Sequence, residues 1–86
     1  MFKVYVLQSE KDGSYYIGST GDLNKRLIKH NKGYSTYTKN KRPWQLAYEE
    51  THNTLSEARR REFYIKSLKS RIAIEKLINL APSSSG

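Results

Sequence analysis

The Asp12-Gly13 pair constrains the fold more than any other feature, because it separates two stretches of strand-forming residues. Residues 2–9 are rich in β-branched and aromatic side chains, which are typical of strands. An Asp-Gly pair between such stretches is typical of a tight hairpin turn. We therefore predict two antiparallel strands, 2–9 and 14–18, with Asp12 and Gly13 at the centre of the turn.

This turn predicts a register in which Ser9 lies opposite Tyr16 and Leu7 lies opposite Gly18. Alternate residues of a strand share a face, so Tyr5 is expected on the same face as Tyr16. Gly18 has no side chain, so this register leaves open space where the backbone of a ligand could approach. A slip of one residue would put the two tyrosines on opposite faces of the sheet.

A helix and a third strand are expected to follow the hairpin. Asp22 is a candidate N-cap for a helix that Gly33 ends. Pro43 precedes a strand over about residues 44–51. The alternating apolar residues of this strand, which we expect on one face, are Trp44, Leu46 and Tyr48.

Two more helices complete the predicted fold. Residues 54–57, Thr-Leu-Ser-Glu, form a capping box that begins a helix running to about Leu68. A last helix is expected over about residues 71–80, and residues 81–86 are expected to form a disordered tail. The chain is therefore predicted to be an α+β domain over residues 1–80. Its sheet is small, three-stranded and mostly antiparallel, flanked by helices in the order β-β-α-β-α-α.

Composition excludes several classes of protein. The chain has 86 residues, enough for one modest core, and its lack of cysteine excludes disulfides, thiol nucleophiles and thiolate metal sites. No apolar run approaches the length of a membrane span, and the apolar N-terminal stretch is too short for a signal peptide. We therefore predict a cytoplasmic protein without membrane contact.

The net charge of +8 is unevenly distributed along the chain. No acidic residue lies between Leu23 and Tyr48, and a second basic cluster covers residues 59–61. Single-sign clusters are typical of proteins that bind polyanions, although solvated helix faces are an ordinary alternative. Tyr34 and Tyr37 could stack on bases within this region. The candidate nucleic-acid-binding residues are Lys25, Lys29, Lys32, Lys39, Lys41 and Arg42.

Arg26 and His30 lie four residues apart, so they share one face of the predicted first helix. An arginine presents paired donors that suit phosphate recognition. Each residue also has a structural interpretation that is favoured when it is taken singly. Arg26 could be a surface arginine lying along the helix, and His30 a partly buried, hydrogen-bonded imidazole.

Glu62 falls between Ala58 and Ile65, on the apolar stripe of the predicted second helix. A carboxylate is costly to bury without a partner. A metal ion or an arginine would satisfy it, and so would a structural ion pair with Lys66 one turn further on. The ion pair is the favoured interpretation of a lone glutamate.

Taken together, two tyrosines, an arginine, a histidine and a carboxylate suit metal-assisted phosphoryl transfer. A carboxylate can hold a hard divalent cation that keeps several waters. An arginine stabilises charge that develops in the transition state. A tyrosine close to a cation and an arginine can have a lowered pKa and take a proton from water.

The order and spacing of these motifs resemble those of the GIY-YIG nuclease superfamily. Residues 3–5, Lys-Val-Tyr, are followed after ten residues by Tyr-Ile-Gly at 16–18, which resembles the paired motif of that superfamily. Residues 18–31 resemble its helix with a catalytic arginine, and residues 58–66 resemble the segment with its metal-binding glutamate. The subgroup that it resembles is that of small stand-alone bacterial proteins. The fold is shared with the N-terminal domain of the incision component of excinuclease ABC.

The resemblance implies a metal-dependent endonuclease that hydrolyses DNA phosphodiester bonds, with branched, single-stranded or damaged DNA as candidate substrates. It implies a single divalent cation, Mg²⁺ or Mn²⁺, bound to Glu62. It also implies the catalytic residues: Arg26 as electrophilic helper, Tyr5 or Tyr16 in water activation, and His30 beside the tyrosine.

The sequence differs from the superfamily pattern at two positions. Lys3 replaces the glycine of the first motif, and Ile74 stands where members outside this subgroup often have an asparagine. A non-catalytic nucleic-acid-binding module of the same fold is the main alternative function. A further alternative is a subunit whose protein partner supplies the specificity for the substrate.

Overall fold

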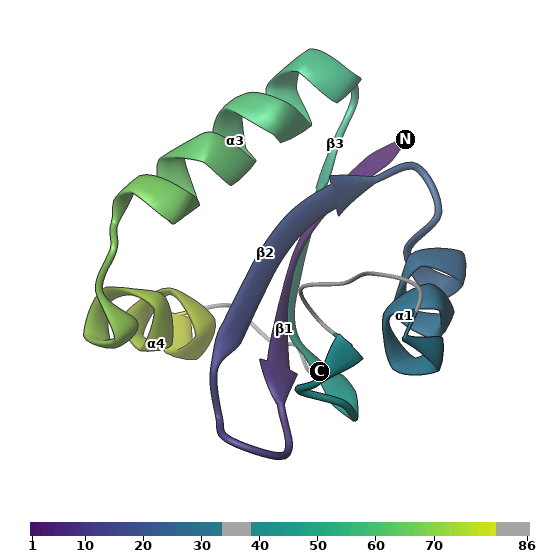
Figure 1. Cartoon of the computed structure of the whole chain (residues 1–86). Helices are drawn as coiled ribbons and strands as arrows, with labels where there is room; N and C mark the ends of the chain where they lie inside the picture. The colour runs from purple at the N-terminus through teal and green to yellow at the C-terminus, as the bar shows by residue number, and fades with distance from the viewer. Residues whose placement is uncertain (34–38, 81–86) are drawn as a thin grey trace.

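The computed structural model describes residues 1–33 and 39–80, which form a three-stranded antiparallel sheet with helices on both faces (Figure 1). The predicted α+β fold and its order of elements are confirmed. Tyr34, Tyr37 and the predicted tail lie outside the described residues. The elements are β1 (Phe2–Ser9), β2 (Tyr15–Thr20), α1 (Leu23–Lys32), β3 (Trp44–His52), α3 (Leu55–Ser67) and α4 (Arg71–Leu80).

The strand order is β2-β1-β3, so β1 lies in the centre of the sheet and β2 forms one edge. Tyr5 lies opposite Gly18, and Leu7 lies opposite Tyr16. The predicted partners were therefore wrong by two residues. The cause is a turn of four residues, 10–13, in place of two, and the Ser9 backbone N–H closes it by donating to the Ser14 carbonyl at 2.8 Å. A shift of two residues keeps every side chain on its face, so Tyr5 and Tyr16 share a face as predicted.

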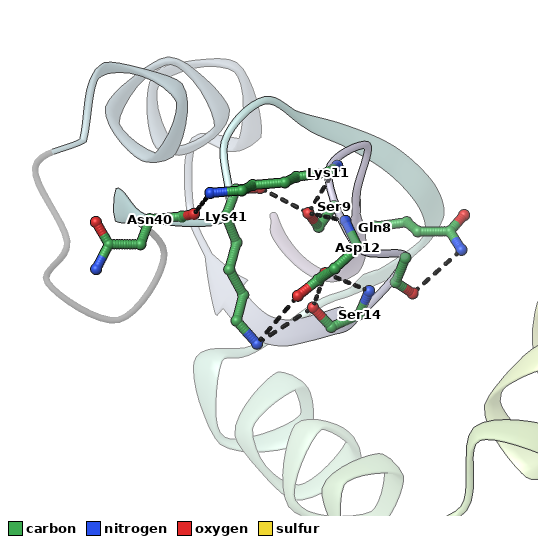
Figure 2. A network of polar contacts seen from close by, with 8 residues as sticks. Gln8, Ser9, Lys11, Asp12, Ser14, Asn40 and Lys41 are labelled. Atoms are coloured by element: carbon green, nitrogen blue, oxygen red, sulfur yellow. Dashed lines mark hydrogen bonds and ion pairs between the residues drawn. The ribbon is translucent and has the colours of Figure 1, made fainter.

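A polar network holds this turn against the segment that precedes β3 (Figure 2). The Ser9 hydroxyl donates to the Lys41 carbonyl at 2.7 Å, and Lys41 Nζ lies 3.7 Å from Asp12 Oδ2. Hydrogen bonds from the Ser14 side chain and backbone lower the pKa of Asp12 to about 2. Gly13 has a φ of 78°, a left-handed conformation that favours glycine. Contacts distant in sequence therefore stabilise the longer turn.

Each face of the sheet has its own core, and Figure 1 shows α3 and α4 on one side and α1 on the other. The buried residues on the α3 and α4 side are Val4, Val6, Ile17, Ala58, Ile65 and Ile74. On the α1 side, Tyr5, Leu7 and Trp44 are buried and pack against Tyr16, Leu23 and Leu27. The α1 core therefore contains both tyrosines of the candidate site.

The predicted alternation along β3 was wrong at Tyr48. A β-bulge pairs Tyr48 with Val6 but Leu46 with Leu7, so Ala47 has no partner of its own in the ladder. A bulge reverses the face of the residues beyond it. Tyr48 consequently packs with the α3 core, whereas Trp44 packs with the α1 core.

The predicted helix ends are confirmed by their caps. Asp22 accepts a hydrogen bond from the Lys25 backbone N–H at 3.1 Å, and Gly33 ends α1 with a φ of 81°. The Thr54 hydroxyl accepts from the Glu57 backbone N–H at 3.1 Å at the start of α3. No helix within residues 1–33 and 39–80 has the length and apolar character needed to cross a membrane.

Candidate functional site

A pocket of about 410 Å³ lies at the edge strand β2 and draws residues from both faces of the sheet. Tyr5 and Tyr16 reach it from the α1 face, whereas Ser19 and Glu62 bond to each other on the α3 face. The lining residues are Tyr5, Tyr16, Gly18, Ser19, Arg26, Arg59, Glu62, Phe63 and Lys66. Four of the five residues predicted for catalysis and metal binding therefore line one pocket, and His30 is the exception.

Gly18 brings the Tyr5 hydroxyl to the edge of the sheet. A Cβ added at Gly18 would lie 2.5 Å from the Tyr5 hydroxyl oxygen, closer than atoms can approach. The side chain of Tyr5, on the central strand β1, therefore covers Gly18 on the edge strand β2. The predicted open space beside Gly18 is therefore filled by Tyr5 where a side chain would begin, although Gly18 still lines the pocket.

Tyr5 and His30 form a buried pair behind the pocket. The Tyr5 hydroxyl lies 3.3 Å from His30 Nε2, and the rings of Tyr16 and His30 are 4.7 Å apart between centroids. Burial lowers the pKa of His30 and the charge of Arg26 adds to this effect, so both favour the neutral imidazole. His30 is thus the buried, hydrogen-bonded imidazole that the sequence allowed, in contact with the tyrosines of the pocket.

The environment of Tyr5 differs from the sequence expectation. Burial raises the pKa of Tyr5 well above its usual value, and the nearby Tyr16 and Glu62 add to this effect. The charge of Arg26 lowers this pKa but is outweighed. Desolvation of Tyr5 is therefore stronger than the attraction of Arg26 alone, whereas the sequence prediction was for a tyrosine beside both an arginine and a bound cation.

Two arginines bring positive charge to the pocket. Arg26 is exposed on α1 and Arg59 is exposed on α3, and both line the pocket. Within residues 1–33 and 39–80, no hydrogen bond or ion pair engages either guanidinium. Guanidinium groups with free donors are suited to a phosphate group.

Glu62 lies on the pocket wall with its side chain 19% exposed. Its Oε1 accepts a hydrogen bond from the Ser19 hydroxyl at 2.6 Å, and Lys66 Nζ lies 2.6 Å from Oε2. The ion pair with Lys66, which the sequence offered as one interpretation, is confirmed. A cation therefore already contacts one oxygen of this carboxylate.

These donors fit a divalent cation that keeps most of its water. The described residues contain no group of three or more His, Asp or Glu side chains that could hold a metal. Magnesium, however, is commonly bound by one or two carboxylates together with water and substrate phosphate. Glu62 supplies one carboxylate beside the Ser19 hydroxyl, and the Lys66 ammonium contacts its other oxygen.

The residues predicted to bind nucleic acid do not line this pocket. Lys25, Lys29 and Lys32 are exposed along α1, and Lys39 and Arg42 line a separate pocket of about 400 Å³. The Lys41 ammonium contacts Asp12 and Ser14 at the hairpin turn (Figure 2). Sequence reasoning missed Ser19, Arg59, Phe63 and Lys66 as parts of the site. The i, i+3, i+4, i+7 spacing of Arg59, Glu62, Phe63 and Lys66 on one helix could have identified most of them.

The fold and the pocket agree with the comparison to known families. A family model described as the GIY-YIG catalytic domain matches residues 1–77. Since this match covers most of the chain, the protein belongs to the GIY-YIG family, which is a nuclease family. The resemblance inferred from the sequence motifs is confirmed.

The chain is also similar to individual proteins, each named as a UPF0213 protein. A UPF0213 protein of Staphylococcus saprophyticus is 49% identical over 65 residues, which cover 74% of this chain and 78% of the relative. A UPF0213 protein of Staphylococcus aureus is 46% identical with the same coverage. The solution NMR structure of a UPF0213 protein from Bacillus halodurans is 36% identical, with a TM-score of 0.61, and the match covers 94% of this chain and 86% of that one.

Proposed function

We propose that this protein is a metal-dependent endonuclease that hydrolyses DNA phosphodiester bonds at the β2-edge pocket. One observation carries the proposal: Tyr5, Tyr16, Arg26 and Glu62 line a single pocket although they come from four different elements. Phosphoryl transfer needs little covalent chemistry from the protein and depends mainly on positioning and charge stabilisation. This pocket combines a carboxylate, free guanidinium groups and phenol hydroxyls.

In the proposed reaction, Arg26 and Arg59 bind the phosphate and stabilise the negative charge of the transition state. Glu62 and Ser19 would hold Mg²⁺ or Mn²⁺, which supplies Lewis-acid stabilisation of the phosphate oxygens when it is bound. Lys66 pairs with Glu62 and lines the pocket, so its ammonium would compete with that cation for the carboxylate and would supply a further phosphate contact.

The Tyr5–His30 pair supplies a route for the proton of the attacking water. A free Tyr5 phenolate is disfavoured at pH 7 because its pKa is raised. A concerted transfer avoids this species: the water proton passes to the Tyr5 oxygen while the Tyr5 proton passes to the neutral His30 Nε2, 3.3 Å away. Tyr16 is less buried than Tyr5 and lines the pocket beside it, so it remains the alternative group for water activation.

A non-catalytic nucleic-acid-binding module is the second candidate function. The Lys66–Glu62 ion pair favours it, because the carboxylate already has a cationic partner. Ile74 also favours it: members outside this subgroup often have an asparagine at this position, and Ile74 is buried here at 8% exposure. Both functions require nucleic acid at the pocket, and only the first requires cleavage.

Incubation of the protein with labelled branched, single-stranded and abasic DNA separates the two functions. We expect cleavage with Mg²⁺ or Mn²⁺ and none with a chelator. Arg26→Ala should reduce the cleavage rate by roughly 100- to 1,000-fold, the usual loss for one charge-stabilising donor. Arg60→Ala is the control, because Arg60 is also exposed on α3 but lines a different pocket. Protein that binds this panel but cuts none of it with either metal would establish the binding module instead.

A further inference from the structure

Phe63 is an exposed aromatic side chain beside the candidate catalytic residues. It is 76% exposed, although it follows Glu62 directly on α3 and lines the same pocket. A single exposed apolar residue is ordinary in a folded protein. Phe63 differs from the exposed Ile28 and Ile72, which do not line this pocket.

Two cations flank this ring on α3. Arg59 lies one turn before Phe63 and Lys66 lies one turn after it, and all three line the pocket. The rise of an α-helix separates the two cations by about 10 Å along the axis, with the ring between them. An aromatic ring near cations suits single-stranded nucleic acid, since the ring can stack on a base while the cations contact the backbone.

In the part of the chain that the structure describes, the next residue along α3, Tyr64, has a cation over its ring, whereas Phe63 does not. Tyr64 is 52% exposed, but the Arg61 guanidinium lies over its ring at 5.2 Å from the centroid. Tyr64 lines another pocket, together with His52 and Arg60. Within the described residues, no such cation or ring contact covers Phe63. The face of Phe63 therefore remains accessible to a planar ligand.

We propose that Phe63 is a nucleobase-stacking site that holds an unpaired nucleotide beside the phosphate in the pocket, with Arg59 and Lys66 as backbone contacts. This inference rests on the proposed function, because it assumes that the pocket takes nucleic acid. It narrows the substrate to strands with an unpaired base near the bound phosphate. A base in the interior of a duplex is covered on both faces by its neighbours, so it cannot stack on a protein ring without being flipped out.

Binding to a single-stranded DNA oligonucleotide in the presence of a chelator tests this site without cleavage. Phe63→Leu should weaken binding by about 5- to 150-fold, which corresponds to the loss of one stacked base. Phe63→Trp should retain the affinity. Tyr64→Leu is the matched control and should bind as the parent does. Melting temperatures of the two Phe63 variants should match the parent, because Phe63 is exposed, whereas Tyr64→Leu loses the contact with Arg61 and should be slightly less stable.

The same binding measurement with an oligonucleotide of abasic sugar-phosphates, which has no bases to stack, is the second part of the test. The parent should bind it more weakly than the normal strand, and Phe63→Leu should bind both equally. Equal affinity of Phe63→Leu and the parent for normal single-stranded DNA would overturn the stacking site. A parent dimer in sedimentation equilibrium that Phe63→Leu dissociates would also overturn it, in favour of self-association. Since no metal is present, a failure of the nuclease proposal leaves this result unchanged.

Discussion

Glu50 on β3 and Glu62 on α3 are almost equally accessible, with side chains 18% and 19% exposed, but their partners differ. Glu50 accepts from the Arg61 Nε at 2.8 Å, contacts His52 Nε2 at 2.8 Å and accepts from the Tyr48 hydroxyl. Glu62 has Ser19 and the side chain of Lys66, which is itself 52% exposed. Burial of a carboxylate is therefore accommodated in two ways within one small domain.

This difference separates a structural carboxylate from a candidate functional one. Burial tends to raise the pKa of Glu50, but hydrogen bonds from Tyr48, His52 and Arg61 outweigh it and lower the pKa. Glu50 is thus fully engaged by fixed neighbours. Glu62 faces a pocket with free guanidinium groups, and its charged partner within the described residues is an exposed lysine on a long side chain. The number and rigidity of partners, rather than the degree of burial, distinguish the two.

The largest expected effect is a loss of cleavage activity in the Glu62→Gln variant. This change keeps the shape of the side chain and removes the charge that would bind a cation, so the cleavage rate should fall on the order of 100-fold or more. DNA binding in chelator should persist, since a negative charge near the phosphate is lost. A Glu62→Gln protein that is clearly less stable but cuts at the parent rate would contradict the metal assignment. The same assay on Glu50→Gln should give a rate close to that of the parent.

The second-largest expected effect is on stability. Here Glu50→Gln should be the more strongly affected variant, whereas Glu62→Gln is the more strongly affected one in cleavage. Glu50→Gln weakens three hydrogen bonds and leaves Arg61 without its countercharge, which should cost about 1–3 kcal/mol in the free energy of unfolding. Glu62→Gln should cost less, because it loses one ion pair with an exposed lysine. Urea denaturation of both variants and the parent measures this. Equal losses in the two variants would remove the distinction between the carboxylates.

The elements that could be predicted from the sequence are those set by local chemistry. The caps of α1 and α3 depend on Asp22, Gly33 and Thr54, which act on residues at most three or four positions away. The shared face of Tyr5 and Tyr16 was also predicted correctly, because strand faces depend only on the parity of the register. The Lys66–Glu62 pair is four residues apart on one helix and was predictable for the same reason.

The features that could not be predicted depend on contacts distant in sequence. The four-residue turn is stabilised by Lys41, which lies 29 positions beyond Asp12 and whose contact no local pattern indicates. The bulge at Ala47 redirects Tyr48 toward α3, and no glycine or other turn residue marks it. The Ser19–Glu62 hydrogen bond spans 43 positions. The candidate catalytic residues could be chosen by motif, but the pocket that they line could be found only in the packed fold.

A smaller effect is expected when Lys66 is removed. If Glu62 binds a divalent cation, the Lys66 ammonium competes with it, and Lys66→Met should raise the affinity for Mn²⁺ by about twofold or more. That factor follows from the ~0.3–0.5 kcal/mol of an i, i+4 ion pair on a helix. Electron paramagnetic resonance of free Mn²⁺ measures the affinity without any reaction. Lys25→Met is the control, because it makes the same change of charge away from the pocket. Unchanged or weaker Mn²⁺ binding by Lys66→Met would favour a purely structural Glu62.

The smallest expected effect is the response of the Glu50 cluster to acid. The pKa of Glu50 is lowered in the folded protein, so this group binds fewer protons there than in the unfolded chain at moderately acidic pH. Its contribution to stability is therefore complete above the unfolded pKa of about 4.5 and is lost as the pH falls through the lower folded value. The free energy of unfolding, measured by urea denaturation from pH 7 to pH 3, should decrease less steeply in Glu50→Gln than in the parent. Tyr48→Phe, which removes one of the hydrogen bonds that lower this pKa, should give an intermediate slope. Identical slopes in all three proteins would mean that Glu50 is not held by its neighbours, and the contrast with Glu62 would then have to rest on the pocket alone.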